Sequence, residues 1–302
     1  MNARCKLAAI FLLGFANTSV AAEAPPQQCR LTLFSALDIE TLPDGRIGVP
    51  VAMEKHPMLF LVDTGGAVAT VNYDKVAVLG KSVKNSPRQL IGVGGTVMSS
   101  YVTADSFLLG RLSGSDLALY VESRPLEGVD GTLAPDMLKR LDVDIDFANS
   151  KLNLFSQEHC PGKVVYWTNG GYVALPMMVS DISGHIRVPV TIDGKKIMAT
   201  IDTGASTSIM SLSAAKAIGI SEGDPQLKSN PSSGFYRSYS YPFRTLDFDG
   251  VTVTNPRVVI ASDDFLKGLG DDLIIGIGIL RQLHLYIAYK EEKLYITPAL
   301  AN

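Results

Sequence analysis

The stretch LVDTGGAV, residues 61–68, has a close counterpart in ATIDTGAS, residues 199–206, and the pair indicates how this chain folds. Each is an apolar run that ends at an aspartate, Asp63 or Asp202, and turns at once into Thr-Gly. A single Asp-Thr-Gly indicates no more than a turn after a strand, because all three residues favour turns for ordinary backbone reasons. Two copies in matching surroundings are a stronger observation.

The match between the two copies extends well beyond the tripeptides. A Val-Pro-Val segment precedes each aspartate by the same number of residues, at 49–51 and at 188–190. Downstream, residues 138–155 align without gaps to residues 280–297. Self-similarity over such a length is the signature of a repeated structural unit. The sequence therefore predicts two like halves in one chain.

Short β-branched and aromatic runs, separated by Gly, Pro, Asn and Asp, dominate both halves and indicate strands joined by tight turns. Helical periodicity is confined to short pieces, such as one whose start Ser211 or Ser213 can cap. We expect a mainly β protein with two similar β-barrel lobes related by a pseudo-twofold axis. The N-terminal lobe is expected at 23–156, a linker at 157–187 and the C-terminal lobe at 188–302.

The first 22 residues have the layout of a secretory signal peptide. Arg4 and Lys6 precede the apolar stretch LAAIFLLGF, and a segment of small residues follows, as is typical of a cleavage site. An apolar run this short does not span a bilayer. We therefore expect removal of residues 1–22, no membrane anchor afterwards, and a periplasmic or secreted protein.

The composition excludes some classes of partner. Hydrophobic residues make up 46% of the chain and charged residues 19%, which indicates a folded globular protein. The formal net charge is −3 and no basic block occurs. The electrostatic pattern of a protein that binds nucleic acid or anionic lipid is therefore missing.

The cysteines are candidates for a disulfide, and the histidines are candidates for metal ligands. Cys29 and Cys160 are the two cysteines beyond the signal peptide. Export favours a disulfide between them, and two separate thiols are the alternative. The histidines show none of the short-range spacing with carboxylates that indicates a metal-binding helix. No metal and no cofactor are expected.

A pseudo-twofold axis between the lobes would bring Asp63 and Asp202 face to face. Two carboxylates in contact share a proton and titrate as a coupled pair. One can then act as a base toward a water molecule while the other, protonated, donates to a substrate carbonyl. Supporting roles are expected for the residues that complete the two tripeptides, Thr64, Gly65, Thr203 and Gly204.

On these motifs the sequence resembles the retropepsin-like aspartic proteases, close to the bacterial aspartyl-protease family with two Asp-Thr-Gly lobes in one chain. The residues that carry the resemblance are FLVDTGGA, ATIDTGAS, the hydrophobic-hydrophobic-Gly element LIIGIGIL and the Gly-rich stretch IGVGGTV. The resemblance implies two pepsin/retropepsin-like lobes with the active site in the cleft between them. It further implies an aspartic endopeptidase with Asp63 and Asp202 as catalytic dyad and an extended peptide as substrate.

A protein with both aspartates in one chain is expected to be a monomer, although each copy could instead pair with another chain. IGVGGTV resembles a flap that closes over the substrate, with Gly94 and Gly95 at its tip. The corresponding stretch of the second copy, NPSSGFYRSYSY, offers Phe235 and Tyr236 as an aromatic wall. Ordinary surface hairpins are the alternative for both stretches.

The sequence departs from the family pattern behind both aspartates. Ala134 stands in the first copy where the second has Gly276, and we expect it to shift the loop behind Asp63 slightly. Gly66 and Ala205 stand where pepsin-type enzymes carry hydroxyl residues. Without those donors the charged form of the dyad is less favoured, which predicts activity at a milder pH than that of pepsin.

These departures leave a second function open, a degenerate family member that binds peptides or a partner protein without cutting them. A periplasmic solute-binding protein would fit the length and the signal peptide. The β-rich repeats disfavour that third class.

Overall fold

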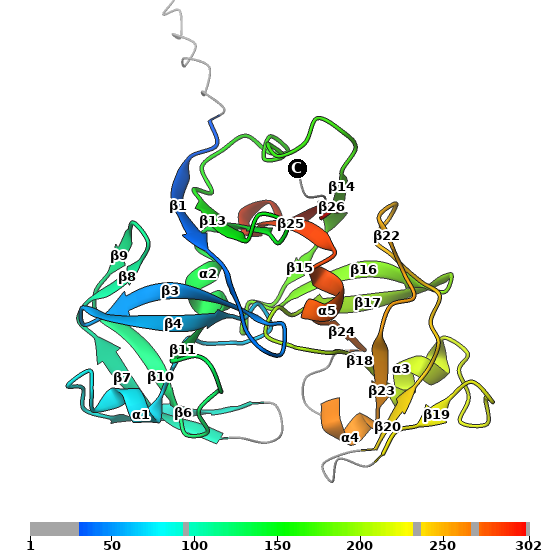
Figure 1. The fold of residues 1–302 in the computed structure, drawn as a ribbon, viewed down its shortest axis with the longest axis horizontal. Coiled ribbons are helices and arrows are strands. Elements are labelled where there is room, and N and C mark those ends of the chain that lie inside the picture. The colour runs from blue at the N-terminus through cyan, green and yellow to red at the C-terminus, as the bar shows by residue number, and fades with distance from the viewer. Residues whose placement is uncertain (1–29, 93–96, 232–236, 267–271, 300–302) are drawn as a thin grey trace, which may run out of the picture.

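The computed structural model describes residues 30–92, 97–231, 237–266 and 272–299. Two similar lobes lie side by side, and a six-stranded sheet to which both halves of the chain contribute lies above them (Figure 1). The protein is mainly β, which confirms the fold class predicted from the sequence.

The N-terminal lobe is built on a ten-stranded sheet. Its strand order is β6-β7-β10-β5-β11-β4-β3-β8-β9, with β2 paired to β3. The strands are β2 (Glu40–Thr41), β3 (Ile47–Met53), β4 (His56–Val62), β5 (Thr70–Asn72), β6 (Lys84–Ile91), β7 (Val97–Ala104), β8 (Phe107–Leu109), β9 (Leu112–Gly114), β10 (Leu117–Glu122) and β11 (Gly131–Leu133).

The C-terminal lobe repeats this sheet strand for strand. Its order is β19-β20-β23-β18-β24-β17-β16-β21-β22, with β15 paired to β16. The strands are β15 (Met178–Val179), β16 (Ile186–Ile192), β17 (Lys195–Ile201), β18 (Ser208–Ser211), β19 (Lys228–Ser229), β20 (Ser238–Ser240), β21 (Thr245–Asp247), β22 (Thr252–Thr254), β23 (Val258–Ala261) and β24 (Leu273–Ile275). The internal repeat of the sequence is therefore a repeat of topology.

The six-stranded sheet joins the two halves. Its order is β1-β13-β12-β25-β26-β14, and β12 and β25 pair antiparallel at its centre. Each half of the chain thus contributes three strands, arranged alike on either side of the central pair. The strands are β1 (Leu33–Asp38), β12 (Asp142–Asp146), β13 (Lys151–Phe155), β14 (Val173–Pro176), β25 (Leu283–Ala288) and β26 (Lys293–Pro298).

The helices are short and lie at strand ends. They are α1 (Tyr73–Val76), α2 (Pro135–Leu138), α3 (Leu212–Ala217), α4 (Asp263–Leu266), α5 (Ile277–Leu280) and the 3-10 turn η2 (Tyr289–Glu291). Ser211 caps α3, as predicted, because its Oγ accepts a hydrogen bond from Ala214 N at 3.0 Å. In the residues that the structure describes, no helix has both the length and the apolar character needed to cross a membrane.

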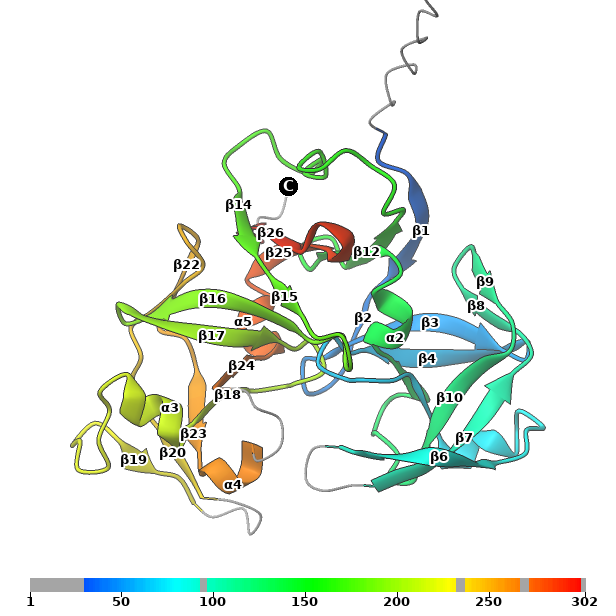
Figure 2. The same cartoon turned by 180° about the vertical axis from the view of Figure 1, so that it is seen from behind.

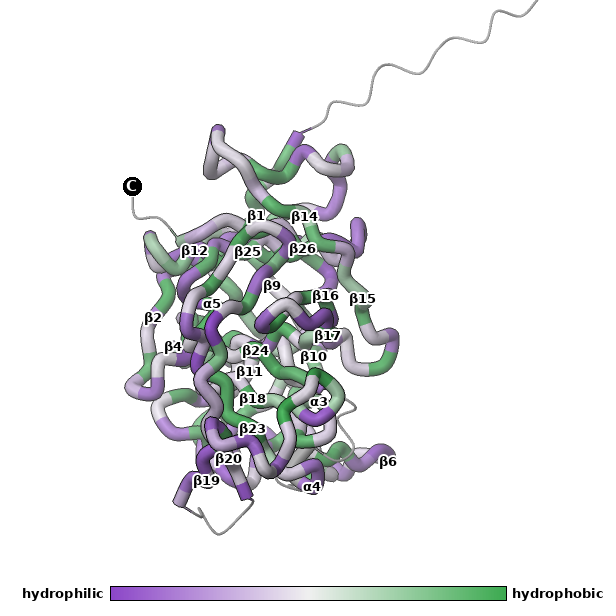
Figure 3. Tube along the Cα trace, turned by 90° about the vertical axis from the view of Figure 1, so that its right-hand side faces the viewer, coloured by the Kyte–Doolittle hydropathy of each residue, from purple (hydrophilic) through white to green (hydrophobic). Residues whose placement is uncertain are grey.

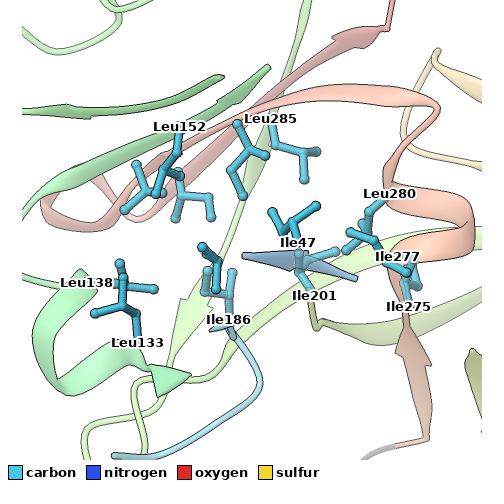
Figure 4. Close-up of a cluster of buried hydrophobic side chains, with 14 of the residues drawn as sticks. Ile47, Leu133, Leu138, Leu152, Ile186, Ile201, Ile275, Ile277, Leu280 and Leu285 are labelled. Carbon is cyan, nitrogen blue, oxygen red and sulfur yellow. The ribbon is translucent and has the colours of Figure 1, made fainter. Parts of the chain in front are cut away.

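One hydrophobic core runs through both lobes and the shared sheet. Figure 4 shows Leu133 and Leu138 of the first lobe close to Ile186 and Ile201 of the second, with Leu285 of the shared sheet above them. The tube in Figure 3 shows hydrophobic segments along the central strands and hydrophilic ones at outer turns. Because burial of apolar surface is the main favourable term in folding, this continuous core sets how the lobes face each other.

Each lobe also sends a turn across the boundary to a helix of the other lobe. The turn before β16 packs on α2, where a Cβ on Gly184 would lie 2.6 Å from Pro135 Cβ (Figure 2). The turn before β3 lies against α5, and Arg281 Nη2 donates a hydrogen bond to Gly45 O at 3.1 Å. These reciprocal contacts place the two strand ends that carry the aspartates at the boundary.

The predicted linker, 157–187, contains β14, β15 and the first residues of β16. Its earlier part packs on the shared sheet, where Trp167 stacks on His284 with 4.3 Å between ring centroids. Cys160 is disulfide-bonded. Cys29 lies outside the described residues, so its pairing with Cys160 stays a prediction.

Candidate active site

The two aspartates occupy equivalent positions at the ends of buried strands. Asp63 follows the last residue of β4 and Asp202 follows the last residue of β17. Asp63 N donates to Leu133 O on the parallel neighbour β11 at 2.9 Å, and Asp202 N donates to Ile275 O on β24 at 3.0 Å. The backbone of each aspartate is therefore held by the strand beside it.

The amides that follow each aspartate hold its carboxylate. Asp63 Oδ1 accepts hydrogen bonds from Gly65 N at 2.9 Å and from Gly66 N at 2.8 Å. Asp202 Oδ1 accepts the equivalent bonds from the second and third residues after it, at 2.8 and 3.0 Å. Both side chains are thus oriented by backbone donors that cannot move independently of the turn.

The two threonines lock the turns to each other across the lobe boundary. Thr64 N donates to Thr203 Oγ1 and Thr203 N donates to Thr64 Oγ1, each at 3.1 Å. The hydroxyls donate in turn to the strand ends of the opposite lobe, Thr64 Oγ1 to Ile201 O at 2.7 Å and Thr203 Oγ1 to Val62 O at 2.6 Å. Both threonines are fully buried. This reciprocal set leaves the aspartates little freedom to separate.

The glycines allow the carboxyl groups to approach. A Cβ on Gly65 would lie 2.2 Å from Asp202 Cγ, and a Cβ on Gly204 would lie 2.3 Å from Asp63 Oδ1. Each glycine therefore packs its backbone against the carboxylate of the other lobe. The side chains of Asp63 and Asp202 are hydrogen-bonded to each other. The structure thus brings together the six residues that the sequence singled out at the two tripeptides.

The surroundings raise the pKa of both carboxyl groups, for partly different reasons. Burial raises the pKa of Asp63, while the amides of Gly65 and Gly66, the hydrogen bond with Asp202 and the charge of His185 act in the opposite direction. Burial, followed by the negative charge of Asp63, raises the pKa of Asp202 well above the usual range. The two carboxyl groups are therefore coupled, and they share one proton and titrate as a pair.

Sequence reasoning did not assign His185 to this site. His185 lies directly before β16, and its charge acts on Asp63. Its Nε2 is buried and has no hydrogen-bond partner among the described residues. The repeat gave no signal for it, because the equivalent residue of the first half is Arg46.

The flap residues Gly94, Gly95, Phe235 and Tyr236 lie outside the described residues. The strands that flank the first of these stretches, β6 and β7, pair antiparallel, with Ile91 opposite Val97. β19 and β20, which precede and follow Phe235 and Tyr236 in the chain, also pair antiparallel. Both stretches thus join neighbouring strands, and their role as flaps stays a prediction.

The residues that the structure describes contain no group of three or more His, Cys, Asp or Glu arranged to hold a metal ion. Among them, His159 and His284 each lie near two carboxylates and make a short contact with one of them. His159 Nε2 is 2.5 Å from Asp142 Oδ2, and His284 Nε2 is 2.6 Å from Asp144 Oδ1. The contact of His159 with Asp142 joins the segment after β13 to the shared sheet. The contact of His284 with Asp144 joins the two halves of that sheet.

Comparison with known protein families gives evidence that is independent of the site's geometry. A family model described as aspartyl protease matches the chain twice, at residues 49–137 and at residues 188–279. Each matched segment contains one Asp-Thr-Gly and reaches the short helix behind it. No curated protein matches the chain.

Proposed function

The chain belongs to the aspartyl protease family, and we propose that it is an active aspartic endopeptidase in which Asp63 and Asp202 together activate a water molecule. The observation that carries this proposal is the hydrogen-bonded carboxyl pair at the lobe boundary. The family match supports a protease-type function in general, and the geometry of the pair supports the specific chemistry.

In this mechanism Asp63 is the general base and Asp202 the general acid. Asp63 takes a proton from the water as its oxygen attacks the carbonyl carbon of the peptide, and Asp202 gives its proton to the carbonyl oxygen. Collapse of the tetrahedral intermediate then breaks the C–N bond, and the leaving nitrogen takes a proton from Asp63. Asp202 recovers its own proton from the collapsing diol. No covalent acyl-enzyme forms.

The hydrogen bonds around the pair supply the preorganisation that this chemistry needs. Backbone amides orient both carboxylates, and the exchanged bonds between Thr64 and Thr203 hold the two turns together. Such fixed dipoles and donors lower the reorganisation required during reaction. An extended peptide lying across the boundary would meet both carboxyl groups at once.

The pH at which the enzyme works follows from the same surroundings. Burial raises the pKa of both carboxyl groups, and neither Gly66 nor Ala205 offers a hydroxyl that would stabilise the charge. We therefore propose a milder optimum than that of pepsin. A profile of kcat/KM against pH with an optimum as acidic as pepsin's would contradict this.

The experiment that tests the function is incubation of the purified mature protein with a mixed peptide library. We expect cleavage that a statine-type transition-state mimic inhibits and that falls by about 100-fold or more in Asp63→Asn and in Asp202→Asn. Retained cleavage in either variant would overturn the dyad. Peptide binding by a wild-type protein that cleaves nothing would favour the alternative, a degenerate family member that binds peptides or a partner protein.

We propose that the site is complete in a single chain, because the bonds that join its two halves are all intramolecular. The partner is then a peptide or protein substrate, and the expected solution mass is that of a monomer. Light scattering after size-exclusion chromatography measures it, and a dimeric mass would contradict the proposal.

We also propose export to the periplasm or the cell exterior, with loss of residues 1–22. The disulfide at Cys160 supports an oxidising compartment. Cell fractionation and N-terminal sequencing of the recovered protein test this. An intact N-terminus on protein from the cytosolic fraction would contradict it.

A further inference from the structure

The turn that carries each aspartate must stay in register with the short helix behind it, and the second lobe secures this with two hydrogen bonds. Ile277 N, at the start of α5, donates to Ala205 O at 2.8 Å. Gly276 N donates to Ser208 Oγ at 2.9 Å. One bond is made by the backbone and the other uses a hydroxyl.

The first lobe can form neither of these bonds. The residue equivalent to Ile277 is Pro135, which has no N–H to donate. The residue equivalent to Ser208 is Ala69, which has no hydroxyl. The turn after Asp63 therefore lacks both ties that hold its counterpart after Asp202.

A carboxylate takes their place. Asp136, the second residue of α2, accepts a hydrogen bond from Ala69 N at 2.9 Å and one from Met137 N at 3.0 Å, both on Oδ1. The second lobe has Gly278 at this position and so has no side chain there. Asp136 is half-buried. Hydrogen bonds to a carboxylate are about twice as strong as neutral ones, so one such bond can replace two weaker ties.

We propose that Asp136 is a positioning residue for the dyad, whose carboxylate tethers the end of the turn 63–69 to α2 and so keeps the Gly66 amide on Asp63. This inference rests on the proposed peptidase activity and identifies a part of its machinery that only the first lobe has. Asp136 acts on Asp63, because the amides that donate to this carboxyl group belong to the turn 63–69.

Loss of the tether affects kcat more than KM. The turn carries the amides of Gly65 and Gly66, which orient Asp63 and make none of the contacts expected for the side chains of a bound peptide. Displacement of a reacting group by about 1 Å can reduce the rate by about 100-fold. An interaction that matters only for the reacting geometry lowers kcat and kcat/KM together.

The test compares Asp136→Ala with Asp136→Asn in the full-length mature protein. We expect Asp136→Ala to lower kcat by about tenfold or more with KM changed by less than about twofold. Asp136→Asn keeps an Oδ1 acceptor and is expected to retain kcat within about threefold. Ser208→Ala in the second lobe is the matched control, and its loss should be smaller because the bond from Ile277 N to Ala205 O remains.

A second measurement does not depend on activity. The NMR shifts of the Gly65 and Gly66 amides report their hydrogen bonds to Asp63, and they should move in Asp136→Ala but stay in Asp136→Asn. Unchanged shifts or an unchanged kcat in Asp136→Ala would overturn the tether. A wild-type protein without peptidase activity would refute the proposed function, and the amide shifts alone would then decide about Asp136.

If Asp136→Ala does not fold, a third variant tests the tether. Ala69→Ser combined with Asp136→Gly gives the first lobe the hydroxyl and the glycine of the second. We expect this double variant to fold and to keep kcat within about tenfold of the wild type, since the new hydroxyl can accept from Ala134 N as Ser208 does from Gly276 N. Asp136→Gly alone should have a lower kcat than this double variant, and equal kcat values in the two would overturn the tether.

Discussion

Behind each aspartate the two lobes place a single methyl group, but they take it from opposite sides of the turn. The first lobe has Gly66 in the turn and Ala134 before the helix, whereas the second has Ala205 in the turn and Gly276 before the helix. A Cβ on Gly66 would lie 3.3 Å from Ala134 Cβ and 2.9 Å from Asp63 Oδ2. A Cβ on Gly276 would lie 2.6 Å from Ala205 O.

This difference changes how the departure from the family pattern is interpreted. Ala134 alone could indicate a decaying first lobe. Its methyl group instead lies beside Gly66, the residue that makes room for it. The two lobes are therefore alternative packings of the same turn, which supports the active enzyme over the degenerate binding protein.

The largest effect is expected where the lobes are alike. Gly65→Ala and Gly204→Ala each place a methyl group on the carboxyl group of the opposite lobe. We expect kcat/KM to fall by at least about 100-fold in both, because the pair must separate. Steady-state cleavage of one peptide measures this. Gly171→Ala is the control, since a Cβ there meets nothing within 4 Å, and a much smaller loss in one lobe than in the other would break the equivalence.

The next effect is expected to differ between the two lobes. Gly276→Ala brings a methyl group against the backbone at Ala205 O, which cannot yield as a side chain can, and should lower the free energy of unfolding by about 2–3 kcal/mol. Ala134→Gly removes one methyl group and should cost about 1 kcal/mol. Urea unfolding measures both. Equal costs would show that the two positions are not used differently.

A smaller effect tests the compensation directly. Gly66→Ala should destabilise the protein by about 1–2 kcal/mol, because the new methyl group crowds both Ala134 and Asp63. Combined with Ala134→Gly, part of this loss should be recovered. A double-mutant cycle on unfolding free energies measures the coupling, for which we expect at least about 0.5 kcal/mol. Additive costs would mean that the two residues do not compensate.

The smallest effect concerns the raised pKa values of Asp63 and Asp202. A folded-state pKa above the unfolded one stabilises the protein at low pH, and this contribution is lost as the pH rises through the folded pKa. Asp202→Asn removes that loss, so at neutral pH it should be more stable than the wild type, with the gain vanishing toward acid pH.

Asp63→Asn should gain stability in the same direction, because burial also raises the pKa of Asp63. Thermal and urea unfolding from acid to neutral pH measure both variants. No gain in either variant at neutral pH would contradict the raised pKa values of the pair.

Local features of the fold could be predicted from the sequence. Asp193 and Gly194, a pair typical of hairpin turns, form the turn between β16 and β17 with φ values of 44° and 78°. Pro135 begins α2 and Ser211 caps α3. Each of these depends on the backbone preference of a residue and its immediate neighbours, which no distant contact overrides here. The repeat likewise predicted the two lobes, because like sequences form like strands in a like order.

Other features of the site could not be predicted in the same way. The bond from Ala69 N to Asp136 and the packing of Gly66 on Ala134 join segments that lie far apart in the chain. Nothing in either segment alone indicates its partner. The effect of His185 on Asp63 could not be predicted for the same reason, since it arises only after the two lobes have assembled.

The shared sheet gives the clearest example of contacts that could not be predicted from the sequence. The repeat alignment places Asp142 and Asp144 of one copy where His284 and Tyr286 stand in the other. In the fold they meet, with His284 Nε2 2.6 Å from Asp144 and the Tyr286 hydroxyl donating to Asp142 at 3.1 Å. Two β lobes, each with its Asp-Thr-Gly turn, can be predicted from the repeat in the sequence. Which residues of the two copies become partners follows from the folded structure, because such contacts depend on assembly across the pseudo-twofold axis.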